Sequence, residues 1–273
     1  MSAPCLERDR VVFRATDTHK GRHLAVTPQN SAMRHLSYGR IILGPDVPAV
    51  EFDTGGEEVG LIGLAGEAEV TVGGQAFTLG RHDAIYVPRD EHVTVRTSAS
   101  ADLAECRAPV DHRYPLQHVK YADVVANPGL HFSTGGPSTT RTLNILLGKN
   151  VEAGRLVAGV TRSEPGHWTS WPPHEHAALL EELYVYYDMP PEAFGVQFVY
   201  TNPGEPERVE VVRSGDAVLM PTGYHPNVSI PGHPISFIWI MAAHREVEDR
   251  QFGVVNVQPE FAGVASGLEK GRT

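Results

Sequence analysis

One short stretch of the sequence, residues 166–182, places metal-binding side-chain types close together. It holds His174 and His176 two residues apart. Because alternate residues of an extended strand point to one face of a sheet, both imidazoles aim at the same point. The adjacent carboxylates Glu181 and Glu182 follow, on what we predict to be the next strand. Imidazoles and a carboxylate in this arrangement are ligands for a divalent transition metal.

A later stretch, residues 215–227, supplies a third imidazole. An apolar run ends there in Pro-Thr-Gly-Tyr-His, so that His225 lies just past a turn. Three histidines and one glutamate leave positions free on a six-coordinate ion, which predicts a divalent metal site with room for substrate. The chain has 14 histidines, so a His-x-His pair alone could arise by chance. The glutamate pair and the third histidine favour the metal site over that alternative.

The elements that would position these residues are short strands. Glycine (27) and proline (21) are spread throughout and separate short runs rich in Val, Ile, Thr and Tyr. Most runs alternate apolar and polar residues or are short and fully apolar, which is typical of an all-β sandwich or barrel. The expected strands are residues 58–64, 68–72, 84–87, 92–97, 142–147, 155–160, 183–187, 196–200, 209–212, 217–220 and 235–241. Gly73-Gly74 predicts a hairpin turn, and residues 121–127 predict a short helix.

The sequence repeats itself. Residues 83–88, Asp-Ala-Ile-Tyr-Val-Pro, match residues 216–221, Asp-Ala-Val-Leu-Met-Pro, and a histidine (His92 or His225) follows each proline by four residues. A Glu-Glu pair opens a strand upstream of each copy. The first copy has no His-x-His before its Glu pair, so we expect no metal there and a structural role for His92. We predict two domains: residues 1–120, degenerate and without metal ligands, and residues 121–273, metal-binding with a loose tail.

Composition restricts the class of protein. The chain has 273 residues, 41% of them hydrophobic and 21% charged, as in ordinary soluble proteins. A net charge of −10 without a basic run argues against a nucleic-acid partner. Only Cys5 and Cys106 occur, so no disulfide framework is implied. The start lacks an apolar leader and no long apolar run occurs, so we expect a cytoplasmic protein with no membrane association.

The two metal-binding stretches resemble the paired motifs of the cupin superfamily, and their repetition resembles a bicupin of two jelly-roll β-barrels. The runs at residues 167–176, 180–184, 197–201 and 221–226 are similar to the 5-deoxy-glucuronate isomerases of myo-inositol catabolism. Residues 182–189 also resemble the related isomerases that act on 5-keto-4-deoxyuronate. The likeness covers essentially the whole chain, with specific motifs in the second half and weak ones in the first.

The resemblance implies one divalent metal ion, Zn, Mn or Fe, held by His174, His176, His225 and one glutamate. Generic cupin spacing favours Glu181 as that glutamate, whereas alignment with the 5-keto-4-deoxyuronate isomerases favours Glu182, which we choose. It further implies conversion of 5-deoxy-D-glucuronate to 5-dehydro-2-deoxy-D-gluconate by a homodimer. Some residues depart from the family pattern: His167, Glu175 and the ending at residues 250–260.

Such an aldose–ketose isomerase must move protons between adjacent carbons and between their oxygens. A divalent ion that contacts both oxygens acidifies the C–H bond and stabilises the charge that develops. The candidates for the general base are the second glutamate, Glu181, and nearby tyrosines, with Tyr184 and Tyr224 assigned to catalysis.

Substrate recognition requires a cation for the carboxylate of a sugar acid. Arg141 and Arg162 are the candidates, because an arginine fork matches a carboxylate. Gln197 and Tyr186 are predicted to orient hydroxyls. Two alternatives to the isomerase are an Fe(II) dioxygenase, since the same ligand set binds that ion, and a non-catalytic sugar-binding cupin.

Overall fold

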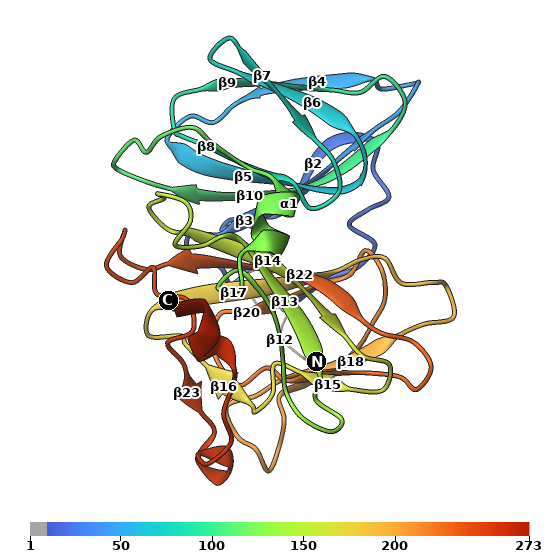
Figure 1. The fold of residues 1–273 in the computed structure, drawn as a ribbon, viewed down its shortest axis with the longest axis vertical. Helices are drawn as coiled ribbons and strands as arrows, with labels where there is room; N and C mark the ends of the chain where they lie inside the picture. Colours follow the sequence, from blue (N-terminus) through green and yellow to red (C-terminus); the bar gives the residue numbers. More distant parts are fainter. Residues whose placement is uncertain (1–9, 273) are drawn as a thin grey trace, which may run out of the picture.

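The computed structural model describes residues 10–272, which form two stacked β-barrels (Figure 1). The strands of the first half, blue to green, lie above those of the second half, yellow to red. Each barrel pairs one large antiparallel sheet with a four-stranded sheet. This agrees with the all-β class predicted from the period-two runs and with the two barrels implied by the repeat and the cupin resemblance.

The first barrel contains a six-stranded and a four-stranded sheet. In spatial order, the six-stranded sheet consists of β11 (Gln117–Val119), β8 (Ala84–Val87), β5 (Glu57–Gly66), β10 (Ala101–Pro109), β3 (Ser37–Leu43) and β2 (Gly21–Val26). The four-stranded sheet consists of β4 (Ala49–Asp53), β9 (His92–Arg96), β6 (Ala68–Val72) and β7 (Gln75–Leu79). Gly73 and Gly74 make the predicted hairpin turn between β6 and β7, and both have the positive φ that such a turn requires.

The second barrel repeats this plan with a seven-stranded and a four-stranded sheet. The seven-stranded sheet consists of β1 (Val12–Phe13), β20 (Ala217–Met220), β17 (Leu180–Tyr186), β22 (Ser236–Ala243), β14 (Leu156–Ser163), β13 (Arg141–Leu147) and β12 (His131–Thr134). The four-stranded sheet consists of β15 (Trp168–Thr169), β21 (Asn227–Ser229), β18 (Gly195–Val199) and β19 (Arg208–Val212). A two-stranded sheet joins β16 (His174–Glu175) to β23 (Asn256–Val257).

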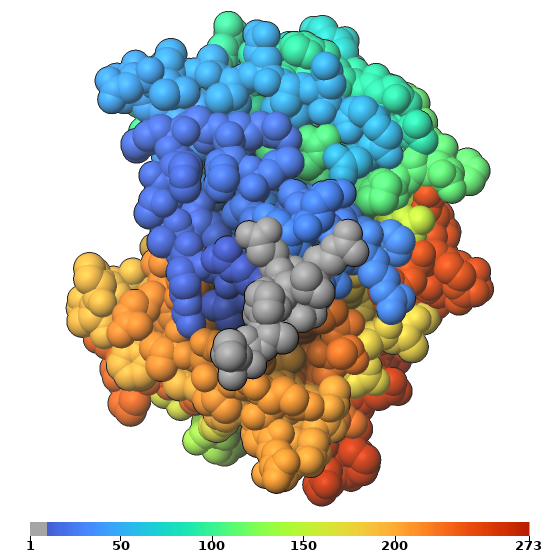
Figure 2. Space-filling model, turned by 180° about the vertical axis from the view of Figure 1, so that it is seen from behind, coloured from blue at the N-terminus to red at the C-terminus, as the bar shows by residue number. Residues whose placement is uncertain are grey.

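The strand β1, at the start of the described chain, joins the large sheet of the second barrel. β1 precedes the first barrel yet pairs with β20 of the second, through Val12 opposite Val218 and Phe13 opposite Ala217. β11 follows the first barrel and pairs with β8 of that barrel, just before α1 (Tyr121–Ala126) and the second barrel begin. Figure 2 shows the early, blue segments lying against the orange strands of the second half. β1 therefore lies in the second barrel, although it precedes every strand of the first along the chain.

Three apolar clusters form the core. One fills the first barrel around Leu61 and Val93, and one fills the second around Tyr186 and Phe237. The third lies between the two large sheets and combines side chains of both halves, such as Leu146 with Ala104. Because alternate residues of a strand face opposite sides, each large sheet contributes one face to its own barrel and the other to the shared interface.

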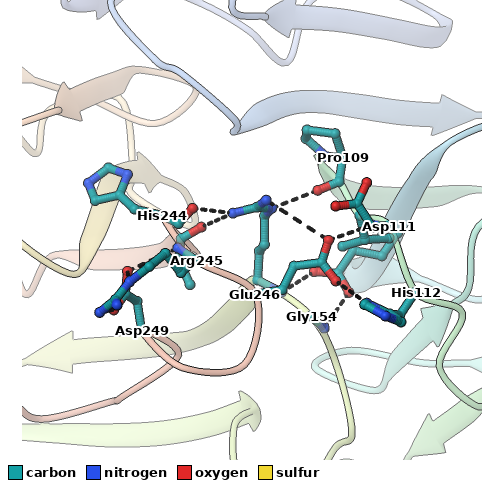
Figure 3. Close-up of polar contacts among 12 residues, drawn as sticks. Pro109, Asp111, His112, Gly154, His244, Arg245, Glu246 and Asp249 are labelled. Atoms are coloured by element: carbon teal, nitrogen blue, oxygen red, sulfur yellow. Dashed lines mark hydrogen bonds and ion pairs between the residues drawn. The ribbon is translucent and has the colours of Figure 1, made fainter.

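Polar contacts supplement this interface at its edge. Glu246, which follows β22, accepts hydrogen bonds from the backbone N–H of Asp111 at 2.5 Å and from the Tyr114 hydroxyl at 3.2 Å, and it lies 3.3 Å from His112 Nδ1 (Figure 3). Arg155 donates to the carbonyl oxygens of Pro109 and His244. The end of β10 is thus joined to the segment after β22.

The C-terminal segment differs from the expected loose tail. After β23 it forms two 3-10 helices, η2 (Pro259–Phe261) and η3 (Leu268–Arg272). Arg272 Nε donates to the carbonyl oxygen of Gly253 at 2.8 Å, and Gly271 is buried against Ile145 and Phe252. None of the helices in residues 10–272 is long and apolar enough to cross a membrane.

Candidate metal centre

Three of the four predicted metal ligands meet inside the second barrel. His176, Glu182 and His225 each offer one ligand atom, and these atoms lie within 4.8 Å of one another. Glu182 Oε2 is 2.9 Å from His176 Nε2 and 3.1 Å from His225 Nε2. All three side chains are buried. They come from separate elements, since His176 follows β16, Glu182 lies on β17 and His225 precedes β21.

Hydrogen bonds to the backbone orient the histidine rings. Nδ1 of His174 donates to the carbonyl oxygen of Pro172 at 2.8 Å, and Nδ1 of His176 to that of Leu180 at 3.1 Å. His225 Nδ1 donates to the carbonyl oxygen of Gly223 at 2.9 Å. A carbonyl can only accept, so each neutral ring carries its proton on Nδ1 and presents the Nε2 lone pair. Metal-binding histidines are typically held this way.

His174 lies beside this group. It is 4% exposed, and its ring centroid is 5.0 Å from that of His225 and 6.5 Å from that of His176. Its strand β16 is paired with β23, His174 being opposite Val257. The His-x-His pattern therefore puts both rings on one side of the site, with His174 at a greater distance than the other two ligands.

Two buried polar atoms of the metal-binding group are without hydrogen bonds to the described part of the chain. Glu182 Oε1 and His225 Nε2 are buried and have no hydrogen-bond partner within residues 10–272. Unsatisfied buried polar atoms are costly, by about 1–3 kcal/mol each. Two imidazole nitrogens and a carboxylate oxygen that face one another can bind one divalent cation together. The donor set therefore fits a divalent metal ion.

Burial and mutual contact shift the pKa values of these groups when no ion is present. Burial, reinforced by His225, lowers the pKa of His174 to about 3. Burial acts against ionisation of Glu182, but the neighbouring His176 outweighs it and lowers the pKa of the carboxyl to about 2. Burial acts against the charge on His176, but the Glu182 carboxylate outweighs it and raises the pKa of that imidazole. A metal ion would bind the neutral imidazole and the ionised carboxylate.

The group opens into a pocket. Arg141, Ser170, Tyr184, Trp239 and the apolar residues around them form its walls together with His174, His176 and Glu182.

Arg141, a predicted substrate-binding residue, lines this pocket. It is 3% exposed, and its guanidinium donates to the carbonyl oxygens of Thr139, Trp171 and Ser266. No carboxylate within residues 10–272 lies at ion-pair distance from it. Burial lowers its pKa to about 10, so the guanidinium stays charged at neutral pH. A buried cation without a counter-ion is suited to an anionic ligand.

Tyr184, predicted to act in catalysis, also lines the pocket. Its hydroxyl is 2.7 Å from Ser170 Oγ, and its ring centroid is 5.8 Å from that of His225. It lies on β17 directly opposite Trp239 of β22. Burial, and then the Glu182 carboxylate, raise the pKa of the hydroxyl well above its usual value of 10.

Trp239 was not singled out by the sequence patterns. It is 3% exposed, lines the pocket, and its indole Nε1–H has no hydrogen-bond partner within residues 10–272. Its position in the apolar run 235–241 predicts a core residue, and only the unsatisfied N–H distinguishes it from one. Gly159 makes room for the indole, because a Cβ there would lie 2.2 Å from Trp239 Cζ2.

Glu181 lies on the opposite face of β17 from Glu182. It is 1% exposed, does not line the pocket, and accepts backbone hydrogen bonds from Arg34, His35 and Leu36. Adjacent residues of a strand face opposite sides, so only one of the two glutamates can reach the histidines. The structure thus brings Glu182 to the metal-binding group and does not bring Glu181 to the pocket.

Four further candidates lie away from the pocket lining. Tyr186 and Gln197 are fully buried and bonded to each other at 2.5 Å, with Gln197 also donating to the carbonyl oxygen of His225. Arg162 has a side chain 57% exposed and lies 3.9 Å from Asp188. Tyr224 pairs through its backbone with Tyr200, next to His225 in sequence. Gln197 and Tyr186 therefore support the turn that carries His225.

The C-terminal segment forms one wall of the pocket. Phe252, residues 253–255 and Leu268 line it, and Phe252 stacks on Trp239 with ring centroids 5.0 Å apart. The sequence predicted no such role, because residues 250–260 depart from the family pattern and carry no repeat.

Two β-barrels, one of which contains a buried group of two histidines and a glutamate, define a bicupin whose second half has a candidate metal site. A family model described as KduI/IolB family matches residues 11–257, and the chain belongs to this family. The resemblance noted from the sequence is thereby confirmed.

Curated relatives of the chain are sugar-acid isomerases. It is 33% identical over 165 residues to a 5-deoxy-glucuronate isomerase of Geobacillus thermodenitrificans, which covers 58% of each chain. It is 28% identical to the enzyme of that name from Geobacillus kaustophilus, over 82% of this chain and 85% of the relative. A 4-deoxy-L-threo-5-hexosulose-uronate ketol-isomerase of Opitutus terrae is 30% identical over 69% of this chain and 68% of its own length. The match to the first of these relatives spans less than two thirds of that relative's length.

Solved structures agree on the fold. An IolB-like protein from Salmonella typhimurium LT2 superposes with a TM-score of 0.81 at 21% identity, covering 93% of this chain and 98% of the other. A mutant of Bacillus subtilis oxalate decarboxylase OxdC superposes with a TM-score of 0.61 at 16% identity, covering 85% and 76%. The bicupin fold is thus confirmed.

Proposed function

We propose that this protein is a divalent-metal-dependent isomerase that converts 5-deoxy-D-glucuronate to 5-dehydro-2-deoxy-D-gluconate. The proposal rests on one pocket that contains both a group of metal-binding side chains and the buried cation of Arg141. The ligand atoms of two imidazoles and a carboxylate lie there within 4.8 Å of one another, and a buried arginine lines the same pocket without an ion-pair partner among the described residues. A divalent metal ion would bind the imidazoles and the carboxylate, and the carboxylate of a sugar acid would bind the arginine. Relatives named 5-deoxy-glucuronate isomerase support this choice of acid.

The residues that would hold the ion are His176, Glu182 and His225, with His174 as the fourth ligand. When bound, a divalent ion polarises a carbonyl oxygen and acidifies the neighbouring C–H bond. Three neutral imidazoles with one carboxylate leave the site net positive, which favours the charge that develops on the substrate oxygens. The backbone carbonyls at the Nδ1 atoms keep the rings in position for this task.

Substrate orientation is assigned to Arg141 and Trp239. The guanidinium of Arg141 would bind the carboxylate of the acid, and burial strengthens such a charged hydrogen bond. The indole N–H of Trp239 would donate to a substrate oxygen, which would satisfy a donor that otherwise has no partner. Both side chains line the same pocket as the metal ligands. The acid would then lie with one end at Arg141 and its reacting carbons near Glu182.

Tyr184 is assigned to proton transfer at a substrate oxygen. Its hydroxyl lies in the pocket, where Ser170 Oγ orients it at 2.7 Å. Isomerisation moves a proton between two neighbouring oxygens, and a fixed hydroxyl within reach of them can take part. Glu181 and Tyr224 do not line the pocket, so they have no part in this scheme.

A second candidate substrate is 4-deoxy-L-threo-5-hexosulose-uronate. The Opitutus terrae relative is named for that acid and is about as similar to this chain as the 5-deoxy-glucuronate isomerases. Both acids carry a carboxylate and adjacent oxygens, so the same pocket chemistry applies. The Fe(II) dioxygenase alternative shares the metal ligands but requires oxygen consumption.

The test is to incubate purified protein, stripped of metal and then reloaded with Zn(II), Mn(II) or Fe(II), with each acid under ¹H NMR and an oxygen electrode. We expect interconversion of aldose and ketose with 5-deoxy-D-glucuronate, dependent on metal and without oxygen uptake. Faster conversion of 4-deoxy-L-threo-5-hexosulose-uronate would show that this acid is the preferred substrate. Oxygen uptake, or no turnover of either acid by metal-loaded protein, would contradict the proposal. A homodimer stays a prediction, which light scattering can check.

A further inference from the structure

Glu181 is adjacent in sequence to the metal ligand Glu182 but is bound by the other barrel. Its carboxylate accepts hydrogen bonds from the backbone N–H groups of residues 34–36, at 2.8, 2.8 and 2.6 Å. These residues precede β3 and belong to the first barrel. A buried carboxylate that receives three backbone hydrogen bonds is held in one orientation.

The first barrel makes the same contact in return. Glu58, which is fully buried on β5, accepts hydrogen bonds from the backbone N–H groups of residues 154–156, at 2.8, 2.6 and 2.7 Å. The Tyr86 hydroxyl adds a fourth bond at 2.7 Å. Residues 154–156 lead into β14 of the second barrel, as residues 34–36 lead into β3 of the first. The two glutamates therefore form a reciprocal pair across the interface.

Strand register shows that the two glutamates are equivalent. Glu58 precedes Val59, which lies opposite Val87, and Glu181 precedes Glu182, which lies opposite Met220. Val87 and Met220 each precede the proline of the repeated Asp-Ala motif. Only the second barrel has a metal ligand next to its glutamate, because valine stands at the matching position in the first.

Glu181 lies where β17 is supported on one side only. β20 pairs with β17 from Glu182 onward, whereas Leu180 and Glu181 pair with β22 alone. The carbonyl oxygen of Leu180 accepts the hydrogen bond from His176 Nδ1. Glu181 thus lies between Leu180, whose carbonyl oxygen orients the ligand His176, and Glu182, which is itself a ligand. Its anchoring fixes the start of the strand that carries both.

We propose that Glu181 is a positioning residue for the metal centre, and that the first barrel contributes to metal binding through the backbone N–H groups of residues 34–36. This inference rests on the metal site of the proposed function. The first barrel would then be more than a scaffold, because it would set the geometry of ligands that belong entirely to the second. Outer partners of metal ligands typically contribute about 10- to 100-fold to affinity.

The test compares Glu181→Gln with Glu58→Gln, its matched control at the equivalent position. A glutamine has an NH2 group in place of one carboxylate oxygen, and this group cannot accept a hydrogen bond from a backbone N–H. Each variant therefore weakens one contact between the barrels. Co(II) is the probe, with affinity measured by chelator competition and ligand geometry by visible absorption. We expect Glu181→Gln to lower Co(II) affinity at least about tenfold and to alter the absorption bands. Glu58→Gln should lower the thermal midpoint comparably but keep wild-type affinity and bands.

Two results would overturn the positioning role: wild-type Co(II) affinity and spectrum in Glu181→Gln, or an equal loss in Glu58→Gln. Glu181→Asp keeps the charge but is too short to reach all three N–H groups, and we expect it to lose affinity as well. It replaces the glutamine variant if that variant does not fold by circular dichroism. If wild-type protein binds no Co(II), the metal site itself is contradicted. If all variants bind alike, the metal site stands and only the positioning role falls.

Discussion

Val59 and Glu182 occupy equivalent positions in the two barrels. Each is the third residue of its strand, β5 or β17, and follows Glu58 or Glu181. Each lies opposite the last residue of the neighbouring apolar strand, Val87 or Met220. In the first barrel this side chain packs into the apolar core, whereas in the second it is the carboxylate between two imidazoles. This exchange, together with the absence of a His-x-His pair in the first repeat, distinguishes the filled barrel from the one with the candidate metal centre.

Removing this carboxylate should remove the ion. We expect Glu182→Gln to leave the fold intact and lower metal occupancy by at least about tenfold, because the ligand set loses its only charge. Metal content after gel filtration, measured by mass spectrometry, checks this. His92→Ala is the control, since His92 is the repeat equivalent of His225 but is 58% exposed on β9. Wild-type occupancy in Glu182→Gln, or an equal loss in His92→Ala, would contradict the assignment.

The substrate carboxylate should depend on Arg141 and not on Arg162. Replacing Arg141 by Met should raise KM for the acid by about 10- to 100-fold, the worth of charged hydrogen bonds of about 1.5–3 kcal/mol. The methyl ester of the acid should show no such difference between wild type and variant. Arg162→Met should keep wild-type KM, because that side chain is largely exposed. Steady-state kinetics of wild type, Arg141→Met and Arg162→Met on the acid and on its methyl ester give these values. Equal effects of Arg141→Met on acid and ester would argue against a carboxylate contact.

The indole N–H of Trp239 should matter for substrate and not for folding. Benzothienylalanine at position 239 replaces N–H by sulfur while keeping the shape of the side chain. Because the donor has no partner within the described residues, we expect stability to hold or rise slightly. Substrate affinity should fall by about fivefold or more, the worth of one hydrogen bond of about 1 kcal/mol. Unchanged affinity in equilibrium titrations would show that the donor does not contact substrate.

Gly159 should be intolerant of even one added methyl group. A Cβ there would lie 2.2 Å from the Asn144 carbonyl oxygen and 2.2 Å from Trp239 Cζ2. We expect Gly159→Ala to cost about 1–3 kcal/mol of unfolding free energy and to displace the indole. Gly136→Ala, where a Cβ would meet nothing within 4 Å, is the control. Urea denaturation that ranks the two variants as equal would contradict the close contact at Gly159.

Stability should fall in acid partly through His82. Burial, and then the neighbouring Arg81, lower the pKa of His82 to about 4, and its ring bonds to the Tyr187 hydroxyl at 2.8 Å. Because the folded-state pKa lies below the unfolded value of about 6.5, the unfolded chain binds the proton first as pH falls. Stability is therefore lost between about pH 6.5 and 4, by at most about 3 kcal/mol from this group.

His82→Gln should remove that part of the pH dependence, as seen in the difference between wild-type and variant unfolding free energies across the range. His112→Gln, at a ring that is 80% exposed, should retain the wild-type profile. If the His82→Gln and wild-type curves run parallel from pH 7 to pH 4, the buried neutral histidine is not a source of acid sensitivity.

The sequence predicts most of this architecture because its signals are local. Period-two runs locate the strands, the repeated Asp-Ala motif indicates two similar halves, and His-x-His with a later histidine indicates the candidate ligands. Glu181 and Glu182 show where local signals stop. Each is a carboxylate on the same strand, and only the phase of β17 in its sheet decides which one reaches His176 and His225.

Long-range contacts account for what the sequence leaves open. The pairing of β1 with β20 joins residues about 200 positions apart, and no composition near Val12 or Phe13 indicates it. Arg141 and Arg162 look alike in sequence, yet only one is buried against the pocket. Leu268 belongs to a segment without strong periodicity, but tertiary packing places it in the pocket wall. Trp239 looks like any core residue until its unpartnered N–H is seen.

The most direct measurement is anomalous X-ray scattering from a crystal of the metal-loaded protein, recorded at the absorption edge of the bound metal. We predict a single strong peak per chain, within coordination distance of His176 Nε2, His225 Nε2 and Glu182, with His174 adjoining. A peak elsewhere, or none at this site in protein that turns over the sugar acid, would contradict the account.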